Sequence, residues 1–376
     1  MINPSERRIT HLDNVRGIVV LLACLEHFLY FINVWYVEFF TKRDYLFFYY
    51  DNPLYEKAQA VHSPWIGKFL PIDSFSQLMT WFFIPWVSQF FIALACFNLA
   101  RRTQLEFQQK YFKKLKGFGI LLVFFIVENF VVATDLGDAL SFRPIMAWMI
   151  VLMIISTVYY FFGIKGVSFF FLLSFIQWLL PFESWNRSFE LMMQKSVHPW
   201  FQYGAPLNHY FTSASLGFCI GFIYFQRTIN KTFFFILGIL GLVGTGIYFQ
   251  KLSGFHINPH HVLETEYLMD ESFLGSLGIY SIELLLLMIV IYLDRILPAF
   301  KLPIVNWSGR HSLLIFAIHK IVFLKILAPI RVLIGTHLGF PVTNTSWEMC
   351  FVYLPLVLLT AYLIKSTQIH RIIVES

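Results

Sequence analysis

Residues able to perform chemistry occur within the first thirty positions, where Glu26 and His27 interrupt an apolar run. Arg16 precedes His27 by eleven residues. That spacing is almost three turns of an α-helix, so both side chains would share one helical face about 16 Å apart. Asp13 would lie on the same face and could pair with Arg16. Because imidazole titrates near neutral pH and suits general-base catalysis, the pattern predicts a cation at one end of a helix and a base deep within it.

A structural role is the alternative for each buried polar residue. His27 could form an interhelical hydrogen bond that only holds helices together. Glu26 points roughly 100° away from His27 and could serve the site or a separate contact. Ionisable groups at membrane depth are costly and often functional. Further polar residues inside apolar segments are Glu128, Asn129, Glu283, His319 and Lys320. We expect the first three to be helix–helix locks or site residues, and the last two to be mainly structural.

The strongest basic segment is "LARRTQLEFQQKYFKKLKGFG", which spans residues 99–119. Its arginines and lysines could hold the phosphates of a nucleotide-bearing donor. They could equally reflect the excess of basic residues in cytoplasmic loops and attraction to anionic lipid. The residues that we expect to bind the donor here are Arg101, Arg102, Lys113 and Lys114. No metal is predicted, because the adjacent His260 and His261 lack a third ligand nearby.

These residues require membrane helices to position them. Apolar residues make up 57% of the 376-residue chain and charged residues only 13%, with a mean hydropathy of +0.65. We therefore expect an all-α integral membrane protein, with residues 1–376 forming one domain and a single bundle of about ten transmembrane helices. The expected spans are about 17–40, 76–99, 117–134, 144–163, 166–182, 208–226, 232–250, 273–294, 311–330 and 348–365. A Gly-Ile-Lys-Gly turn at 163–166 predicts a tight hairpin between the fourth and fifth.

Basic residues set the expected orientation. With a cytoplasmic N-terminus, the inner segments would hold sixteen Lys and Arg residues and the outer loops nine. This asymmetry predicts that both termini are cytoplasmic, as in a multi-pass protein of the plasma (inner) membrane. The net charge of +6 is then explained by topology and needs no nucleic acid. The four cysteines show no paired spacing and are expected to be buried small hydrophobes.

The opening run, with Leu12, Asp13, Arg16, Gly17 and His27, resembles the first helix of the acyltransferase-3 family of membrane proteins. In that family the arginine-to-histidine spacing is the signature. The segment "VNWSGRHSLLIFAIH" is similar to a late helix of the same family, and the positions that match are Gly309, Arg310, Ser312, Leu313 and His319. Where the second helix of that family carries a Ser-Gly-Phe-like element, this chain has Ala95-Cys96-Phe97 instead.

A sister family offers a competing alignment. The heparan-α-glucosaminide N-acetyltransferase-like proteins share the Leu-Asp-x-x-Arg-Gly opening. Members can carry the catalytic histidine in the loop after the first helix as His-x-x-Trp, which His62-Ser-Pro-Trp65 matches. The resemblance therefore leaves His27 and His62 as alternative catalytic bases, with His27 favoured.

The resemblance implies an acyl-CoA-dependent acyltransferase. Acetyl-CoA or another acyl-CoA would be the donor, approaching from the cytoplasm toward Arg16 and the basic segment. A sugar or cell-envelope glycan would be the extracytoplasmic acceptor, and a homo-oligomer is possible. The alternatives are a transporter or flippase for a lipid-linked sugar or small solute, and a non-catalytic scaffold or sensor. No internal repeat or matching pair of broken helices favours the transporter.

Overall fold

The computed structural model describes residues 10–41, 74–132, 144–176, 207–227, 231–252, 273–296, 302–327, 329–330 and 348–365. This part of the chain is helical and contains no β-strand, which confirms the all-α prediction for it. In their described parts, all ten predicted apolar segments fall on helices. The longer helices are α1 (Thr10–Thr41), α3 (Ser74–Leu99), α4 (Gln104–Val132), α6 (Pro144–Ile176), α8 (Leu207–Gln226), α9 (Lys231–Leu252) and α10 (Phe273–Ile296). Shorter elements follow, namely α11 (Pro303–Arg310), α12 (Ser312–Ile321), the π-helices η4 (Val322–Leu327) and η5 (Met349–Tyr353), and α15 (Leu354–Lys365).

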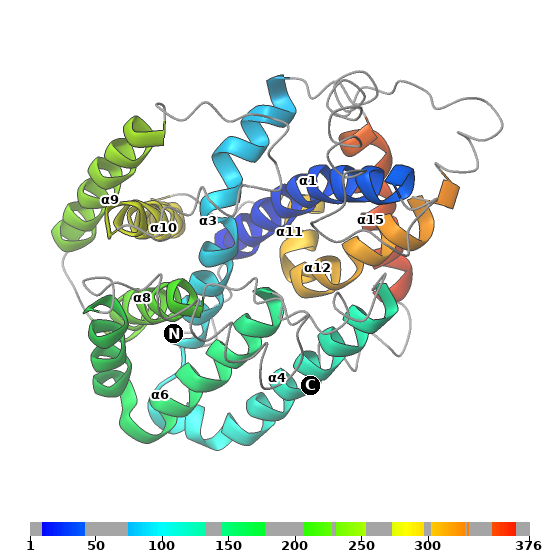
Figure 1. The fold of residues 1–376 in the computed structure, drawn as a ribbon. Coiled ribbons are helices and arrows are strands. Elements are labelled where there is room, and N and C mark those ends of the chain that lie inside the picture. Colours follow the sequence, from blue (N-terminus) through cyan, green and yellow to red (C-terminus); the bar gives the residue numbers. More distant parts are fainter. Residues whose placement is uncertain are drawn as a thin grey trace, which may run out of the picture.

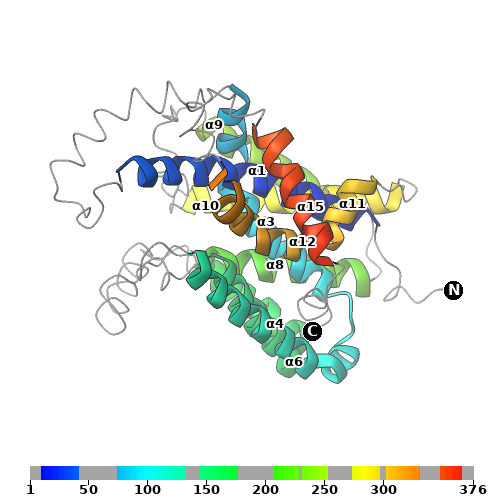
Figure 2. The same cartoon turned by 90° about the vertical axis from the view of Figure 1, so that its right-hand side faces the viewer.

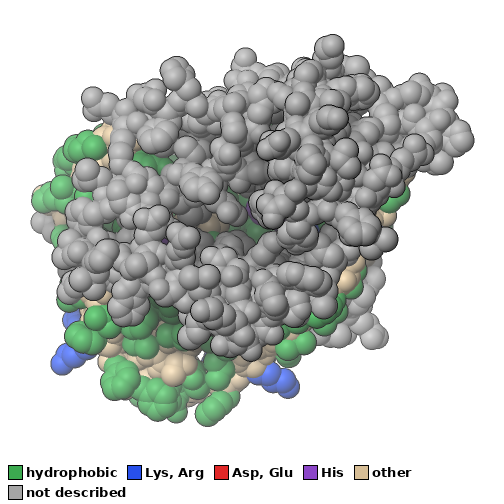
Figure 3. Space-filling model, in the orientation of Figure 1, with side chains coloured by type: hydrophobic (Ala, Val, Ile, Leu, Met, Phe, Trp, Pro, Cys, Tyr) green, Lys and Arg blue, Asp and Glu red, His purple; other side chains and the backbone are tan. Residues whose placement is uncertain are grey.

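Three described segments are long and apolar enough to cross a membrane: Ile145–Phe175, Lys231–Tyr248 and Leu277–Asp294. The helix α9 also exposes large apolar side chains, since Phe235, Leu240 and Leu242 each keep more than half of their surface accessible. Hydrophobic side chains cover most of the described surface visible in Figure 3, with Lys and Arg at its lower margin. An apolar exterior of this kind fits a hydrocarbon solvent better than water.

The helix α6 reverses direction at Gly163. This glycine has a φ of 62° and a ψ of −155°, a left-handed region that favours glycine. A Cβ placed on Gly166 would lie 3.2 Å from a methyl carbon of Val158. Eight residues span about 12 Å in a straight helix, so the chain must fold back. The hairpin predicted at 163–166 is therefore present, and its two arms lie within α6.

The helices pack in contacting pairs. α4 runs beside α6 along one edge of the molecule, while α9 packs on α10 and α8 on α3 (Figures 1 and 2). The helix α1 lies against α11 and α12, which come from the far end of the chain (Figure 1). Buried side chains of α1, including Val20, Cys24 and Phe28, join the core formed with α6, α8, α12 and α15. The opening and late segments of the sequence are thus neighbours in space.

Two glycines allow the closest of these approaches. A Cβ on Gly17 would overlap the carbonyl oxygen of Val305, and a Cβ on Gly309 would overlap that of Asp13. The backbones of α1 and α11 are therefore in direct contact, as small residues permit between membrane helices. The short helix α11 begins with Pro303 at its first turn, a position where the missing N–H carries no cost.

Candidate functional site

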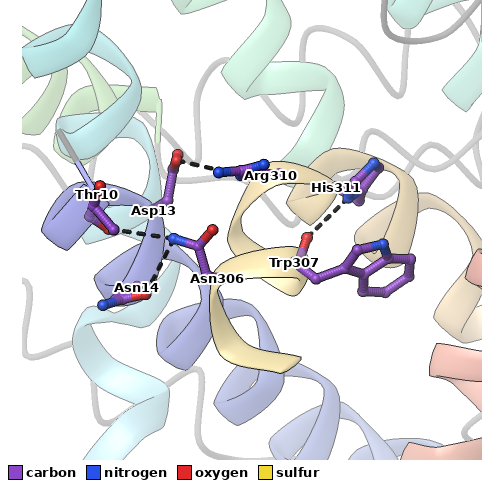
Figure 4. Close-up of polar contacts among 7 residues, drawn as sticks. All are labelled: Thr10, Asp13, Asn14, Asn306, Trp307, Arg310 and His311. Atoms are coloured by element: carbon purple, nitrogen blue, oxygen red, sulfur yellow. Dashed lines mark hydrogen bonds and ion pairs between the residues drawn. The ribbon is translucent and has the colours of Figure 1, made fainter. Parts of the chain in front are cut away.

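A polar junction joins the start of α1 to α11 (Figure 4). The Nε atom of Arg310 lies 3.8 Å from a carboxylate oxygen of Asp13. On the neighbouring turn, the side-chain amide of Asn306 donates to Oδ1 of Asn14 at 3.2 Å and to the carbonyl oxygen of Thr10 at 3.5 Å. The ion pair gives Asp13 a partner that the sequence analysis did not suggest, since a partnership with Arg16 was expected.

Arg16 reaches the beginning of α12. Its guanidinium donates to the hydroxyl oxygen of Ser312 at 3.5 Å, across 296 residues of sequence. Because Arg310 lies at the end of α11 and Ser312 opens α12, the cations Arg16 and Arg310 are both held at the α11–α12 break. Guanidinium groups bind phosphates through planar paired hydrogen bonds. The geometry therefore suits an anion at this break.

His27 meets a second histidine deep in the helices. Its Nδ1 lies 2.7 Å from Nε2 of His319, and the two rings stack with centroids 4.9 Å apart. His319 is buried and His27 partly buried. One continuous helix, α1, carries Arg16 and His27, so the predicted sharing of a face is confirmed. His319, which is expected from the sequence to be mainly structural, thus contacts the predicted base directly.

The hydrogen bonds of His319 fix which nitrogen of His27 is basic. Nδ1 of His319 bonds the carbonyl oxygen of Phe316, and a carbonyl can only accept, so this Nδ1 carries the proton. In a neutral ring Nε2 of His319 is then the acceptor, and Nδ1 of His27 donates to it. The lone pair of neutral His27 is consequently on Nε2. A base oriented by a second group in this way resembles the arrangement of catalytic histidines generally.

Aromatic rings surround the two histidines. Phe316 contacts both rings, with centroid distances of 5.5 Å to His27 and 4.9 Å to His319. Phe316 also packs on Trp148 at 5.2 Å and on Phe91 at 6.0 Å. Such walls keep water away from a base and strengthen the electrostatic interactions around it.

The backbone after His319 departs from an α-helix. The π-helix η4 begins three residues later, and the Tyr353 hydroxyl at the end of η5 donates to the His319 carbonyl oxygen at 3.2 Å. π-Helical turns occur frequently at functional sites. In this protein the two π-helices η4 and η5 lie next to His319, one shortly after it in the chain and the other through the Tyr353 hydrogen bond.

The predicted basic segment lies on different elements, the α3–α4 connection and the first half of α4. The connection is shaped by a capping box, in which the backbone N–H of Thr103 donates to the Glu106 carboxylate and that of Glu106 donates to the Thr103 hydroxyl. The carbonyl oxygen of Arg102 accepts from Tyr159 at 3.1 Å and from Gln226 at 2.7 Å. The backbone at Arg102 is thus tied to α6 and α8, while Lys113 is exposed on α4.

Lys114 differs from the other cations of this segment. Its ammonium nitrogen lies 5.3 Å from the centroid of the Phe107 ring. Burial, and then the positive charges of Arg102 and Lys110, lower the pKa of Lys114 to about 8, although Cys96 acts in the opposite direction. An anion bound beside Lys114 would raise this pKa again, so a phosphate bound there would be coupled to the protonation of Lys114.

Two predicted site residues cannot be placed. His62 lies outside the described residues, and Glu26 lies in α1 with a side chain that is also outside the described part. Two residues that the sequence analysis left out of the site now belong to it, His319 and Arg310. Both stand in the late segment that carried the resemblance, so the motif itself was the available signal. No group of three possible metal ligands occurs among the described residues.

Comparisons with known proteins give no relative. No family model matches the chain, and no curated protein or solved structure matches it significantly.

Proposed function

We propose that the chain is a membrane-bound acyltransferase that passes an acyl group, acetyl in the simplest case, from cytoplasmic acyl-CoA to an extracytoplasmic acceptor. The acceptor would be the hydroxyl or amine of a sugar or cell-envelope glycan. The protein would form one bundle of about ten transmembrane helices in the plasma membrane, with both termini in the cytoplasm. The observation that carries the proposal is the contact between the opening and late segments, which joins His27 to His319 and Arg16 to Ser312.

The position of His27 supports a role as general base. It lies about 16 Å along α1 from Arg16, so an extended acyl-pantetheine arm whose phosphates rest at the α11–α12 break would bring its thioester toward the imidazole. Arg16 and Arg310 would bind the phosphates there. Arg101, Arg102, Lys113 and Lys114 would form the wider cytoplasmic basic surface, with Asp13 orienting Arg310.

The chemistry then follows from the basic nitrogen. Nε2 of His27 takes the proton from the acceptor hydroxyl or amine as the acceptor attacks the thioester carbon. The carbon–sulfur bond breaks, and the departing thiolate takes the proton from the imidazolium. His319 holds the tautomer and stabilises the transient positive charge. Transfer through an acyl-histidine is a second route, because imidazole is a competent nucleophile. Glu26 and His62 remain candidates for assistance or for the base itself.

The first experiment is titration of the purified protein in detergent with acetyl-CoA, CoA and an unrelated nucleotide, by isothermal calorimetry and thermal shift. We expect saturable acetyl-CoA binding that Arg16→Ala weakens about tenfold or more, as loss of a charge-assisted contact predicts. His27→Ala should retain binding and lose acetyl transfer. Lys231→Ala is the control, because this lysine is exposed at the start of α9.

The rival function is transport of a lipid-linked sugar or small solute. A folded parent protein that binds no acetyl-CoA at millimolar concentration would count against acyl transfer and direct the work to transport assays. If acetyl transfer persists in His27→Ala and is lost in His62→Ala, the catalytic base is His62 in the predicted first outer loop.

A further inference from the structure

The helices α8 and α10 share buried polar contacts that the proposed reaction does not use. Three side-chain contacts join the two helices in rising residue order along both: His209 with Tyr280, Ser213 with Glu283, and Tyr224 with Asp294. The order shows that α8 and α10 run parallel. The middle contact contains a carboxyl group near the centre of α10.

Glu283 is completely buried, with 0% of its surface exposed. Its Oε1 accepts a hydrogen bond from the Ser213 hydroxyl at 2.6 Å. Its Oε2 is also buried, and no described group forms a hydrogen bond with it. One carboxyl oxygen is thus satisfied and the other is not.

No described cation neutralises this carboxyl group from the helices around it. The described side chains of α3, from Trp86 onward, carry no charge. On α1, the side chains of Arg16 and His27 reach toward α12. On α9, the ring of Tyr248 lies against Gly278, and Lys231 is exposed at the far end. On α8, the titratable neighbour one turn away is His209, which bonds the hydroxyl of Tyr280.

Protonation resolves this arrangement. When a carboxylate is buried, it loses far more solvation free energy than a hydrogen bond from one neutral donor can replace. A neutral carboxylic acid loses much less solvation free energy, so the same single donor is sufficient for it. In the acid form Oε1 accepts from Ser213 and Oε2 carries the hydrogen. We propose that Glu283 is a proton-binding site whose Oε2 takes up and releases a proton, exchanged with water through His209 and Tyr280.

The route follows from the position of the polar contacts. His209 and Tyr280 lie four and three residues before Ser213 and Glu283, which corresponds to rises of about 6 Å and 4.5 Å toward the starts of both helices. In the other direction, the buried residues of α10 before Asp294 are apolar, namely Leu287, Met288, Val290 and Ile291. Release therefore moves the proton from Oε2 to the imidazole–phenol pair and then to water, leaving the carboxylate. In the topology of the proposed function, on which this sidedness rests, that end is extracytoplasmic.

Infrared spectroscopy of the full-length protein in detergent tests the protonation state. A protonated carboxyl group gives a C=O stretching band that a carboxylate lacks. We expect such a band at neutral pH that disappears in Glu283→Gln and remains in Glu128→Gln, a matched control at another buried glutamate. Ser213→Ala should keep the band and shift it to higher frequency, because the hydrogen bond to Oε1 is lost. If Glu283→Gln removes no carboxyl band, Glu283 is ionised and the proposal is wrong.

Deuterium exchange tests the route. After transfer to heavy water the Glu283 band shifts as its proton is replaced, and the rate of that shift reports access. We expect His209→Ala to slow the exchange at least severalfold while the band remains, and Tyr224→Phe, at the opposite end of α8, to leave the rate unchanged. Equal rates in the parent and His209→Ala would overturn the route. Neither measurement involves acyl transfer. A negative result for Glu283 would therefore leave the proposed function intact, and failure of the acyl-transfer experiments would leave the Glu283 proposal intact.

Discussion

At the scale of single residues, His27 gains its chemical character from a neighbour far along the chain. The hydrogen-bonded series from the Phe316 carbonyl through His319 to His27 leaves the basic lone pair of His27 on Nε2. Without His319 the imidazole could adopt either tautomer and rotate. Under the proposed function His319 is a positioning residue, and its contribution should appear in the rate of transfer rather than in donor binding.

Substitution of His319 tests this role. We expect His319→Ala to lower kcat for acetyl transfer roughly 100-fold or more, because general-base catalysis of this kind contributes about 10² to 10⁴. The KM for acetyl-CoA should change little. His319→Gln, which can place an amide oxygen near the former Nε2, should recover part of the rate. The measurement is steady-state kinetics with radiolabelled acetyl-CoA, and a His319→Ala enzyme with unchanged kcat would assign His319 to packing alone.

Under the proposed function, Lys114 should make donor binding dependent on pH. Its folded-state pKa of about 8 lies below the ordinary value of 10.5, so its charge is lost as the pH rises through 8. If it contacts a donor phosphate, affinity for acetyl-CoA should fall about tenfold between pH 7 and pH 9, the amount expected for one charge-assisted contact. Binding near pH 8 should also take up a proton, which calorimetry in buffers of different ionisation enthalpy detects.

The matched variant for this prediction is Lys114→Arg, since a guanidinium stays charged throughout this range. It should bind the donor with an affinity independent of pH between 7 and 9. If the affinity of the parent protein for acetyl-CoA is also independent of pH between 7 and 9, Lys114 does not contact the donor phosphates.

At the scale of elements, the site depends on how closely α1 and α11 approach. Gly17 and Gly309 permit backbone contact, and this contact aligns Arg16 with Ser312 and Asp13 with Arg310. A slight separation of the helices would break these polar contacts together. The glycine of the opening motif is thus explained by packing, while Arg16 and His27 are the residues to which the proposed function assigns the chemistry.

A pair of glycine substitutions tests this packing. Gly17→Ala should destabilise the protein by about 1–3 kcal/mol, the usual cost of forcing extra volume into a packed interface, and should weaken donor binding as well. Gly119→Ala in α4 is the control, because a Cβ there meets no atom within 4 Å. It should be neutral or stabilise by up to about 1 kcal/mol through helix propensity. Thermal unfolding in detergent measures both, and equal melting temperatures would show that α1 and α11 can separate without cost.

At the scale of the whole molecule, the expected orientation can be tested by cysteine labelling. In a variant whose four native cysteines are replaced, Lys165→Cys at the α6 bend and Lys231→Cys at the start of α9 should react with an impermeant maleimide only after cells are permeabilised. Lys195→Cys, in a predicted outer loop, should react in intact cells. Labelling of Lys165→Cys in intact cells would invert the orientation and place the basic segment on the wrong side for cytoplasmic acyl-CoA.

Local sequence patterns are enough to predict the helical class of the protein and the positions of its helices. Apolar runs bounded by polar segments predicted ten helices, and all ten fall on helices in their described parts. The reason is local, because in an apolar solvent a segment can satisfy its own backbone N–H and C=O groups by forming a helix. The Gly-rich turn at 163–166 predicted the hairpin for the same local reason. The spacing of Arg16 and His27 along one helix was equally local and was confirmed.

Which polar residues contact one another could not be predicted from the sequence, because these contacts depend on how the helices pack. The pairing of His27 with His319, of Asp13 with Arg310 and of Ser213 with Glu283 joins residues separated by 70 to almost 300 positions. Periodicity assigns a side chain to a face of its own helix and carries no information about which other helix that face will contact. Helix–helix packing supplies that information, through close approaches such as that at Gly17, and it converts isolated polar residues into candidate sites.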